Sequence, residues 1–489
     1  MRTLFVVPPA ALTHGPGPVD RVYGCNYAYD VKPPIHLLTV ATMLDEEGHC
    51  VRVFDGPAEG ASLRDFDAVI EEGWDAVLFY TVYLSIRDDL AAARRIRQRH
   101  RAPLPKMIFM CTGANWKPDA FEFGDDSFII LGEPERTVLE LIAMLEGRSA
   151  ADPSTIDGLG YWRNGRYRRT GFRNLLDVND LPIPNRRLLR GTYRLNRLEE
   201  QPATVLYTSR GCGYRCTFCT PNAVDQGIEL EYKKTQEVYV KRPPLRTRRP
   251  ELVIEEFRQL SDMGYRSVEI CDNLFIFDRD RTMAILDGIK ALGLHWLCLS
   301  RAPFLHDEEL VRAMADAGCQ LVYIGSESFS QAILDDVHKD LKVSDIKRAV
   351  ETCRAAGVTP EVSVMMGGSP LETKETIRKS LREATRLGTD FVHFSIALPS
   401  PSTELYDLAR EGGWFVDGDF RPIDNAREAI INLPNLSAGE LKRELKRAYR
   451  AQYLSPRGLL RQAARIRTRR DFVEKAKTAG KLLRYLVSG

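Results

Sequence analysis

Hydrophobic residues in the first 150 positions form short continuous runs that alternate with amphipathic stretches. The stretches between the runs carry apolar residues at every third or fourth position, as a helix packed on one side requires. Runs that are apolar throughout are typical of parallel strands covered on both faces. The runs are TLFVV, CVRVFD, DAVLFY, KMIFMCTG and SFIILG. The pattern predicts an open, doubly wound, Rossmann-like α/β domain over residues 1–150, with its ligand crevice at the carboxyl ends of the strands.

A second and more regular alternation covers residues 201–425. Its helical stretches end in glycine, as a left-handed helix C-cap favours. Its apolar runs are ATVLYTS, SVEICD, HWLCLS, QLVYIGSE, EVSVMMG and FVHFSIALP. Six strands with five intervening helices predict a partial (β/α)6 barrel with a site at the carboxyl ends of its strands. Residues 151–200 are rich in Gly, Asn, Arg and Pro, so we expect a hairpin and a linker between the two domains.

Composition places the chain among ordinary globular proteins. It has 489 residues, of which 44% are hydrophobic and 28% charged. No apolar run approaches the roughly 20 residues that cross a bilayer. The apolar N-terminus ends at Pro8 and Pro9 and shows no signal-peptide cleavage pattern, so we expect a cytoplasmic protein. In that reducing compartment cysteines are mostly free thiols or metal ligands.

The C-terminal part of the chain is strongly basic. Residues 441–489 contain fifteen Lys or Arg against three acidic residues, a balance of +12, so the rest of the chain carries −10 of the net +2. We predict a helical region over 426–489. Two series of apolar residues recur at helical spacing within it: Leu459, Leu460, Ala463 and Ile466, then Phe472, Ala476, Ala479, Leu482 and Leu483. Such helices suit either peripheral contact with the inner face of an anionic membrane or packing on the acidic remainder of the same chain. We favour the packing on the acidic remainder.

Three cysteines lie within eight positions in the stretch YTSRGCGYRCTFCTPN. They are Cys212, Cys216 and Cys219, and they follow the first barrel strand. A zinc site would need a fourth ligand, yet the next Cys and His are Cys271 and His295. Three thiolates on a cubane iron–sulfur cluster instead leave one iron open for a cofactor. The spacing therefore favours a cluster over zinc.

The C-x3-C-x2-C motif on this loop resembles that of the radical S-adenosylmethionine (SAM) enzymes, and Phe218 matches the aromatic residue usual before the last cysteine. The resemblance implies a [4Fe–4S] cluster held by the three cysteines, with SAM completing the coordination of the open iron. It also implies flavodoxin or ferredoxin as the electron donor.

Further barrel segments are similar to motifs of the same family. ICDNLF resembles the acidic segment after the second strand, which makes Asp272 and Asn273 candidate cofactor or substrate contacts. LSRAPF points in the same way to Arg301, and YIGSES to Glu327, which would contact the amino group of SAM. Each has a structural alternative. Arg301 and Asp272 could form an internal ion pair, and Glu327 could cap the following helix.

The N-terminal domain resembles that of the cobalamin-dependent class of this family. The similar segments are PPIHLLTVATMLDEEGHCVRVFD and DSFIILGEPERTVLELI, whereas the D-x-H-x-x-G motif that would supply a histidine to cobalt is absent. Cobalamin is therefore a possible third cofactor. The positions that the resemblance turns toward it lie on three loops: Tyr80, Thr81, Ser85, Gly113 and Gly132.

The resemblance implies an enzyme that uses a 5′-deoxyadenosyl radical to remove hydrogen from an unactivated carbon. Cobalamin-assisted C-methylation of a lipid-like or natural-product small molecule is the favoured reaction. Cyclisation, dehydration or C–C coupling without methyl transfer is the alternative. A non-catalytic metal- or nucleic-acid-binding protein would draw on the basic tail and KRPPLRTRRP, but both lack interleaved aromatic residues, so we expect no nucleic acid partner. The insertion at 224–250 is predicted to be a lid or a substrate contact.

Overall fold

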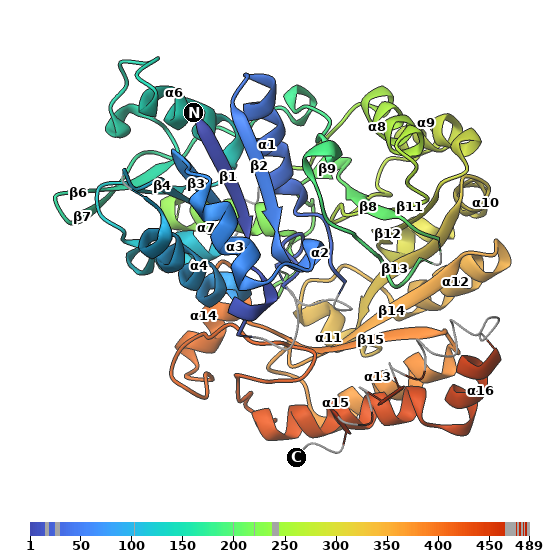
Figure 1. The fold of residues 1–489 in the computed structure, drawn as a ribbon. Coiled ribbons are helices and arrows are strands. Elements are labelled where there is room, and N and C mark those ends of the chain that lie inside the picture. The colour runs from blue at the N-terminus through green and yellow to red at the C-terminus, as the bar shows by residue number, and fades with distance from the viewer. Residues whose placement is uncertain are drawn as a thin grey trace.

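The computed structural model describes residues 1–14, 19–24, 30–101, 103–198, 200–219, 221–236 and 244–464, with single positions beyond. Two sheets form its framework (Figure 1). The first lies in the N-terminal part, drawn in blue and teal, and the second in the green-to-orange part. The C-terminal helices lie along the edge of the second sheet. The predicted order of an open α/β domain, a barrel and a helical extension is confirmed, whereas the exact domain boundaries stay predictions.

The N-terminal sheet has seven strands in the order β2-β1-β3-β4-β5-β6-β7. The first five by sequence are parallel: β1 Arg2–Val7, β2 Cys50–Asp55, β3 Ala76–Tyr80, β4 Lys106–Met110 and β5 Ser127–Ile130. The predicted hairpin is β6 Leu159–Arg163 and β7 Arg166–Arg169, and it extends this sheet antiparallel to β5. The hairpin therefore joins the first sheet, an arrangement that the sequence did not predict.

Alternate side chains of these strands enter two separate cores. Phe5 and Leu78 pack on one face, which α1 Ile35–Glu46 and α6 Pro134–Leu145 cover. Leu4 and Val77 pack on the other, against α3 Leu63–Glu71 and α4 Ile86–Arg99. Both faces are buried, which explains why the strands read as continuous apolar runs. The short helices α2 Gly56–Glu59 and α5 Thr112–Trp116 follow β2 and β4.

The second sheet is parallel, with six strands in the order β15-β14-β13-β12-β11-β8. The strands are β8 Ala203–Leu206, β11 Ser267–Ile270, β12 His295–Ser300, β13 Cys319–Glu327, β14 Thr359–Met366 and β15 Phe391–Ile396. The helices between them include α8 Pro250–Asp262, α9 Arg279–Ile289, α10 Glu308–Asp316, α11 Gln331–Asp336, α12 Val343–Ala355 and α13 Lys374–Arg386. Asp278, Asp307 and Thr373 cap three of these helices through their side chains. The partial barrel is confirmed.

The inside of the barrel is continuous with the core of the N-terminal domain. Val205, Leu297 and Leu321 point inward and belong to the same buried cluster as Leu78 and Tyr80. The outward side chains of the same strands form a separate core with the surrounding helices. The N-terminal domain therefore packs against the open inner side of the barrel.

The insertion after the cysteine loop begins with a helix, α7 Ala223–Gln236. Residues 237–243 lie outside the described part, and β10 Arg246–Thr247 then pairs antiparallel with β9 Ser209–Arg210. The role of the insertion as a lid or a substrate contact stays a prediction.

The C-terminal region begins after α14 Glu404–Glu411 and contains α15 Ala438–Tyr453 and α16 Pro456–Ala464. Near the end of the chain, Leu486 is 5% exposed and its carbonyl accepts a hydrogen bond from Arg450 on α15. Leu459 and Leu460 are 53% and 70% exposed, while Ile466, Phe472 and Leu482 lie outside the described residues. Within the described part of the chain, no helix combines the length and apolar character of a membrane span.

Candidate active site

The three cysteines lie on the loop that follows β8 and β9, at the carboxyl end of the barrel sheet. Gly211 opens this loop with a φ of +91°, and a Cβ there would lie 2.6 Å from the carbonyl oxygen of Pro244. Both the backbone conformation and the close approach therefore require glycine before Cys212. Cys216 is 5% exposed, whereas Cys212 and Cys219 are partly exposed.

The carboxylate of Asp272 fixes the chain just ahead of the cysteines. It accepts hydrogen bonds from the backbone N–H groups of Thr208 at 2.6 Å and Ser209 at 3.1 Å, and from both of their hydroxyls. Asp272 is fully buried, and its burial raises its pKa while the hydrogen bonds oppose that rise. Its observed contacts are thus with the start of the loop; a contact with a cofactor stays a prediction.

Asn273 connects the two ends of the cysteine loop. Its amide nitrogen donates to Asp225 at 2.6 Å, and Asp225 in turn accepts from the backbone N–H of Gly211 at 3.0 Å. Its amide oxygen accepts from the backbone N–H of Asn222 at 2.8 Å. The middle of the loop is held separately, since the N–H of Thr217 donates to the carbonyl of Val337. The loop is therefore positioned by side chains before any cluster binds.

Arg301 lies over the cysteine loop. Its Nη1 is 3.9 Å from Cys216 Sγ, and its guanidinium stands 3.5 Å from the ring centre of Tyr214. Its Nη2 donates to the carbonyls of Lys339 and Asp340. The alternative in which Arg301 pairs with Asp272 is wrong, because Asp272 is occupied by Thr208 and Ser209.

Glu327 ends β13 with a φ of +59°, a strained conformation for a residue other than glycine. Its carboxylate accepts from Lys339 Nζ at 2.9 Å. A Cβ on the neighbouring Gly325 would come within 3.1 Å of both ends of this ion pair, which explains the glycine in YIGSES. Glu327 is not the N-cap of the next helix, α11, where Ser330 holds that position. Its contact with an amino group of SAM stays a prediction.

Lys339 was missed by sequence reasoning. It is 7% exposed and stands between Glu327 and the cysteine loop, within 5.8 Å of the ring centre of Phe218. Burial lowers the pKa of Lys339, but the carboxylate of Glu327 and the thiolate of Cys216 outweigh burial and raise it. The sequence holds no signal for this, because the lysine follows a short helix and reaches the loop only through the fold.

The inner faces of β14 and β15 carry polar residues. Val362, Val364 and Phe394 point outward into the core under the helices and are fully buried, whereas Ser363 and His393 point inward and keep partial exposure. These two residues are paired across the strands. Burial and the positive charge of Arg197 lower the pKa of His393 to about 4. At neutral pH the imidazole is uncharged and can both donate and accept a hydrogen bond.

Arg210, two positions before Cys212, ties the cysteine loop to the N-terminal domain. It donates to Glu133 at 2.8 Å and to Glu135 at 2.5 Å, and all three side chains are buried. Arg246 on β10 also binds Glu133, at 2.9 Å. The Gly-Glu-Pro-Glu segment therefore acts here as the docking point for the cluster loop.

The residues predicted to face cobalamin lie at the carboxyl edge of the N-terminal sheet. Ser85 hydrogen-bonds the buried Asp89, a Cβ on Gly113 would meet Ile86 at 2.8 Å, and one on Gly132, which has a φ of +77°, would meet Phe172 at 2.9 Å. These contacts give Ser85, Gly113 and Gly132 structural reasons for being there. Their role toward a cofactor, like that of Tyr80 and Thr81, stays a prediction.

Two features of this edge fit a large polar ligand. The buried amide oxygen of Asn115 has no hydrogen-bond partner within the described residues, and the buried hydroxyl of Tyr80 has none there besides the thiol of Cys111. Cys111 between them has φ +77° and ψ −176°, a region that almost only glycine adopts and that is found mainly at functional sites. The helix α7 also reaches this edge, since the carbonyl of Ala223 accepts from Cys111 Sγ and Thr112 Oγ1.

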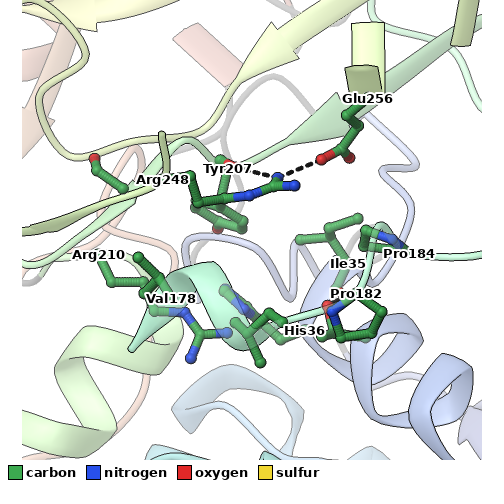
Figure 2. A pocket seen from close by; sticks show the side chains of 12 residues that line it. Ile35, His36, Val178, Pro182, Pro184, Tyr207, Arg210, Arg248 and Glu256 are labelled. Atoms are coloured by element: carbon green, nitrogen blue, oxygen red, sulfur yellow. Dashed lines mark hydrogen bonds and ion pairs between the residues drawn. The ribbon is translucent and has the colours of Figure 1, made fainter. Parts of the chain in front are cut away.

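A pocket between the two domains is too small for a substrate (Figure 2). Arg248 lies between the carbonyl of Tyr207 and the carboxylate of Glu256, while His36 and Arg210 line the opposite side. Its volume of about 30 Å³ holds one or two water molecules. Among the described residues no three His, Cys, Asp or Glu are arranged to bind a single metal ion. A cubane is larger than one ion, so cysteines spread along a loop suit it better.

The model of the radical SAM superfamily matches residues 206–412. This range begins at the end of β8 and includes the cysteine loop, Arg301 and Glu327. Residues 206–412 form a radical SAM domain. The presence of this domain makes the protein an enzyme, and the N-terminal domain lies outside the matched range.

Similar proteins share both domains. An uncharacterized methyltransferase of Pyrococcus horikoshii is 28% identical over 94% of each chain. The radical SAM methyltransferase TsrM from Kitasatospora setae, solved with cobalamin and a [4Fe–4S] cluster bound, is 20% identical with a TM-score of 0.62 over 91% of this chain and 81% of its own. The cobalamin-dependent enzyme OxsB, solved with aqua-cobalamin and SAM, is 14% identical with a TM-score of 0.68 over 99% and 72%. The two-domain fold of this chain is that of the cobalamin-dependent radical SAM enzymes.

Proposed function

We propose that this protein is a cobalamin-dependent radical SAM methyltransferase that transfers a methyl group to a carbon atom of a small natural-product or lipid-like molecule. The observation that carries the proposal is the contact between the cluster loop and the N-terminal domain. Arg210 joins the loop to Glu133 and Glu135, and Ala223 joins its far end to Cys111 and Thr112. A cofactor on the N-terminal sheet and a cluster on the barrel would therefore face one shared space.

Each residue of the site has a defined task in this proposal. Cys212, Cys216 and Cys219 would bind three irons of the cluster, and Glu327 would bind the amino group of SAM. The polar edge at Tyr80 and Asn115 would hold cobalamin. The cofactors supply the radical chemistry and the methyl group, with electrons from flavodoxin or ferredoxin.

The inside of the barrel would receive the substrate. His393 and Ser363 present uncharged hydrogen-bonding groups there, and the inward carboxylates Glu269 and Glu361 are each paired, with Lys32 at 2.8 Å and Arg197 at 3.0 Å. An environment whose charges are neutralised internally favours an uncharged molecule or portion of a molecule. The packed N-terminal domain would keep water away from the reacting carbon.

A second candidate is a radical transformation without methyl transfer, such as cyclisation or dehydration. The packing of α7 on Cys111 and Thr112 favours it, because this helix covers part of the edge that cobalamin would use. Both candidates need the cluster and SAM, and they differ in the need for cobalamin.

The deciding experiment measures cobalt and products together. The protein is purified without oxygen from cells supplied with cobalamin, reconstituted with iron and sulfide, and desalted. Stoichiometric cobalt, with both 5′-deoxyadenosine and S-adenosylhomocysteine formed, supports methyl transfer. 5′-Deoxyadenosine without cobalt or S-adenosylhomocysteine supports the second candidate.

A variant with Cys212, Cys216 and Cys219 changed to Ala should lose the cluster absorbance and all 5′-deoxyadenosine. Cys50→Ala is the matched control, because Cys50 is exposed and remote from the loop. A full cluster in the triple variant would overturn the assignment.

A further inference from the structure

Two cations and one carboxylate form a connected group at the cysteine loop, where Arg301 approaches Cys216. Arg301 Nη1 is 3.9 Å from the sulfur, and the backbone carbonyls of Lys339 and Asp340 hold its other nitrogen. Lys339 is buried next to it and is bound to Glu327 at 2.9 Å. The chain thus places a connected set of charges at the cysteine loop, where little water is available to screen them.

Charges close to a bound cluster act on its redox state. A [4Fe–4S] cluster with three thiolates carries one net negative charge when oxidised and two when reduced by one electron. The electron comes from an external low-potential donor, such as a reduced flavin or dithionite, and no protein group is oxidised. A nearby cation stabilises the more negative, reduced form, and a nearby carboxylate destabilises it.

We propose that Lys339 raises the reduction potential of the cluster at Cys216 and that Glu327 opposes it, so that this ion pair sets the potential at which the enzyme becomes active. The inference rests on the proposed cluster but on no assumption about methyl transfer. Lys339 is a positioning residue in this account, because it acts through the cluster. For the reduction potential, the charge of the Lys339 side chain matters more than its length.

The geometry gives this role to Lys339 more clearly than to Arg301. Arg301 also binds two backbone carbonyls and stacks on Tyr214, so its replacement would disturb the loop. The ammonium of Lys339 binds the carboxylate of Glu327 and lies 5.8 Å from the ring centre of Phe218 on the cysteine loop. Its charge can therefore be changed while the backbone contacts remain.

The test is a redox titration of the reconstituted full-length protein without SAM, followed by the electron paramagnetic resonance signal of the reduced cluster. Lys339→Met should lower the equilibrium constant for reduction about tenfold, or about 59 mV for one electron. Glu327→Gln should shift the potential in the opposite direction. Lys339→Arg and the double variant should lie near the wild type. Lys342→Met, which removes an exposed lysine three positions away, should change nothing.

If Lys339 and Glu327 only supported the structure of the site, the reduction potentials of their variants would not follow the change in charge. Shifts of Lys339→Met and Glu327→Gln in the same direction, or no shift in either, would overturn the proposal. If Lys339→Met fails to hold a cluster, Glu327→Gln tests the proposal: a higher reduction potential supports it, and a lower one overturns it. If the wild type itself assembles no cluster, the proposed function fails, and that outcome is seen before any titration begins.

Discussion

The guanidinium of Arg210 donates a hydrogen bond to the carboxylate of Glu135 over 2.5 Å, in a place where both side chains are buried. One residue belongs to the strand that leads into the cysteine loop, and the other to the first turn of α6 in the N-terminal domain. This ion pair makes the position of the loop depend on the neighbouring domain.

Glu135→Gln should destabilise the protein and weaken cluster retention. Removing one of the two carboxylate partners of Arg210 leaves it compensated by Glu133 alone, so the loss should be smaller than the roughly 3 kcal/mol that breaking a lone buried pair costs. Glu133 still binds Arg210, so the protein should fold. A urea unfolding midpoint and the iron content after desalting measure the two effects. Glu140→Gln is the control, since Glu140 is half-exposed, and equal iron retention in the two variants would contradict the expectation.

Asn273→Asp should reduce iron retention with little loss of fold. The new carboxylate would face Asp225, which the amide now contacts at 2.6 Å, and like charges would push apart the two ends of the loop. Burial already raises the pKa of Asp225 to about 6. Anaerobic reconstitution followed by iron and sulfide analysis provides the measurement. Asn435→Asp, on an exposed turn, should bind iron like the wild type.

Tyr83 should contribute to the contact between the two domains in two separable ways. Its hydroxyl donates to the carbonyl of Pro401 at 2.9 Å, and its ring packs edge-on against Trp116 and Phe420. Tyr83→Phe should cost about 1 kcal/mol through the lost hydrogen bond. Tyr83→Ala should cost about 3 to 5 kcal/mol through the cavity. Thermal and urea midpoints of both variants test this, and similar losses in the two would contradict the packing argument.

Glu372 should make stability depend on pH. It is buried where it accepts from the N–H groups of Gly367 and Gly368 in the turn after β14, and burial raises its pKa to about 7 against an ordinary 4.5. The folded state therefore binds the carboxyl proton of Glu372 more tightly than the unfolded state does. The corresponding stability is present below pH 4.5 and is lost as pH rises to about 7, a change of about 3 kcal/mol.

Glu372→Gln should flatten this dependence, because the amide oxygen still accepts from the turn but carries no charge. The variant should be more stable than the wild type at pH 8 and similar at pH 4.5. Unfolding midpoints of the apoprotein at both values are the measurement. Glu375→Gln, three positions along and exposed, serves as the control. A variant less stable than the wild type at pH 8 would show that the carboxylate stabilises the turn.

The sequence predicted the two sheets because their strands are apolar throughout and their spacing is regular. It also placed Cys212, Cys216 and Cys219 on the correct loop, since a motif next to a strand needs only local information. It predicted the hairpin of β6 and β7 but not that this hairpin extends the first sheet, because the polar stretch RNGRYRR gives no sign of its partner strand.

The neighbours of the cysteines were harder to predict. Lys339 approaches Cys216 from a segment more than a hundred positions away, and Arg210 meets its carboxylates in another domain. The structure brings Asp272 and Arg301 to the cysteine loop, and their roles toward a cofactor stay predictions. Their partners were not predicted, since a sequence shows charges without the directions in which they point. The alternation in FVHFSI did contain a usable signal for His393, because a histidine among apolar residues of a strand occupies the opposite face.

One buried cluster includes Leu78 and Tyr80 of the N-terminal domain and Val205, Leu297 and Leu321 of the barrel. The two domains therefore share one hydrophobic core. If the chain were divided near residue 200, each fragment would expose apolar surface that the other fragment normally buries. For this reason we expect the two domains to occur together in one protein. A barrel domain taken from a relative would need the N-terminal domain of that relative to remain soluble.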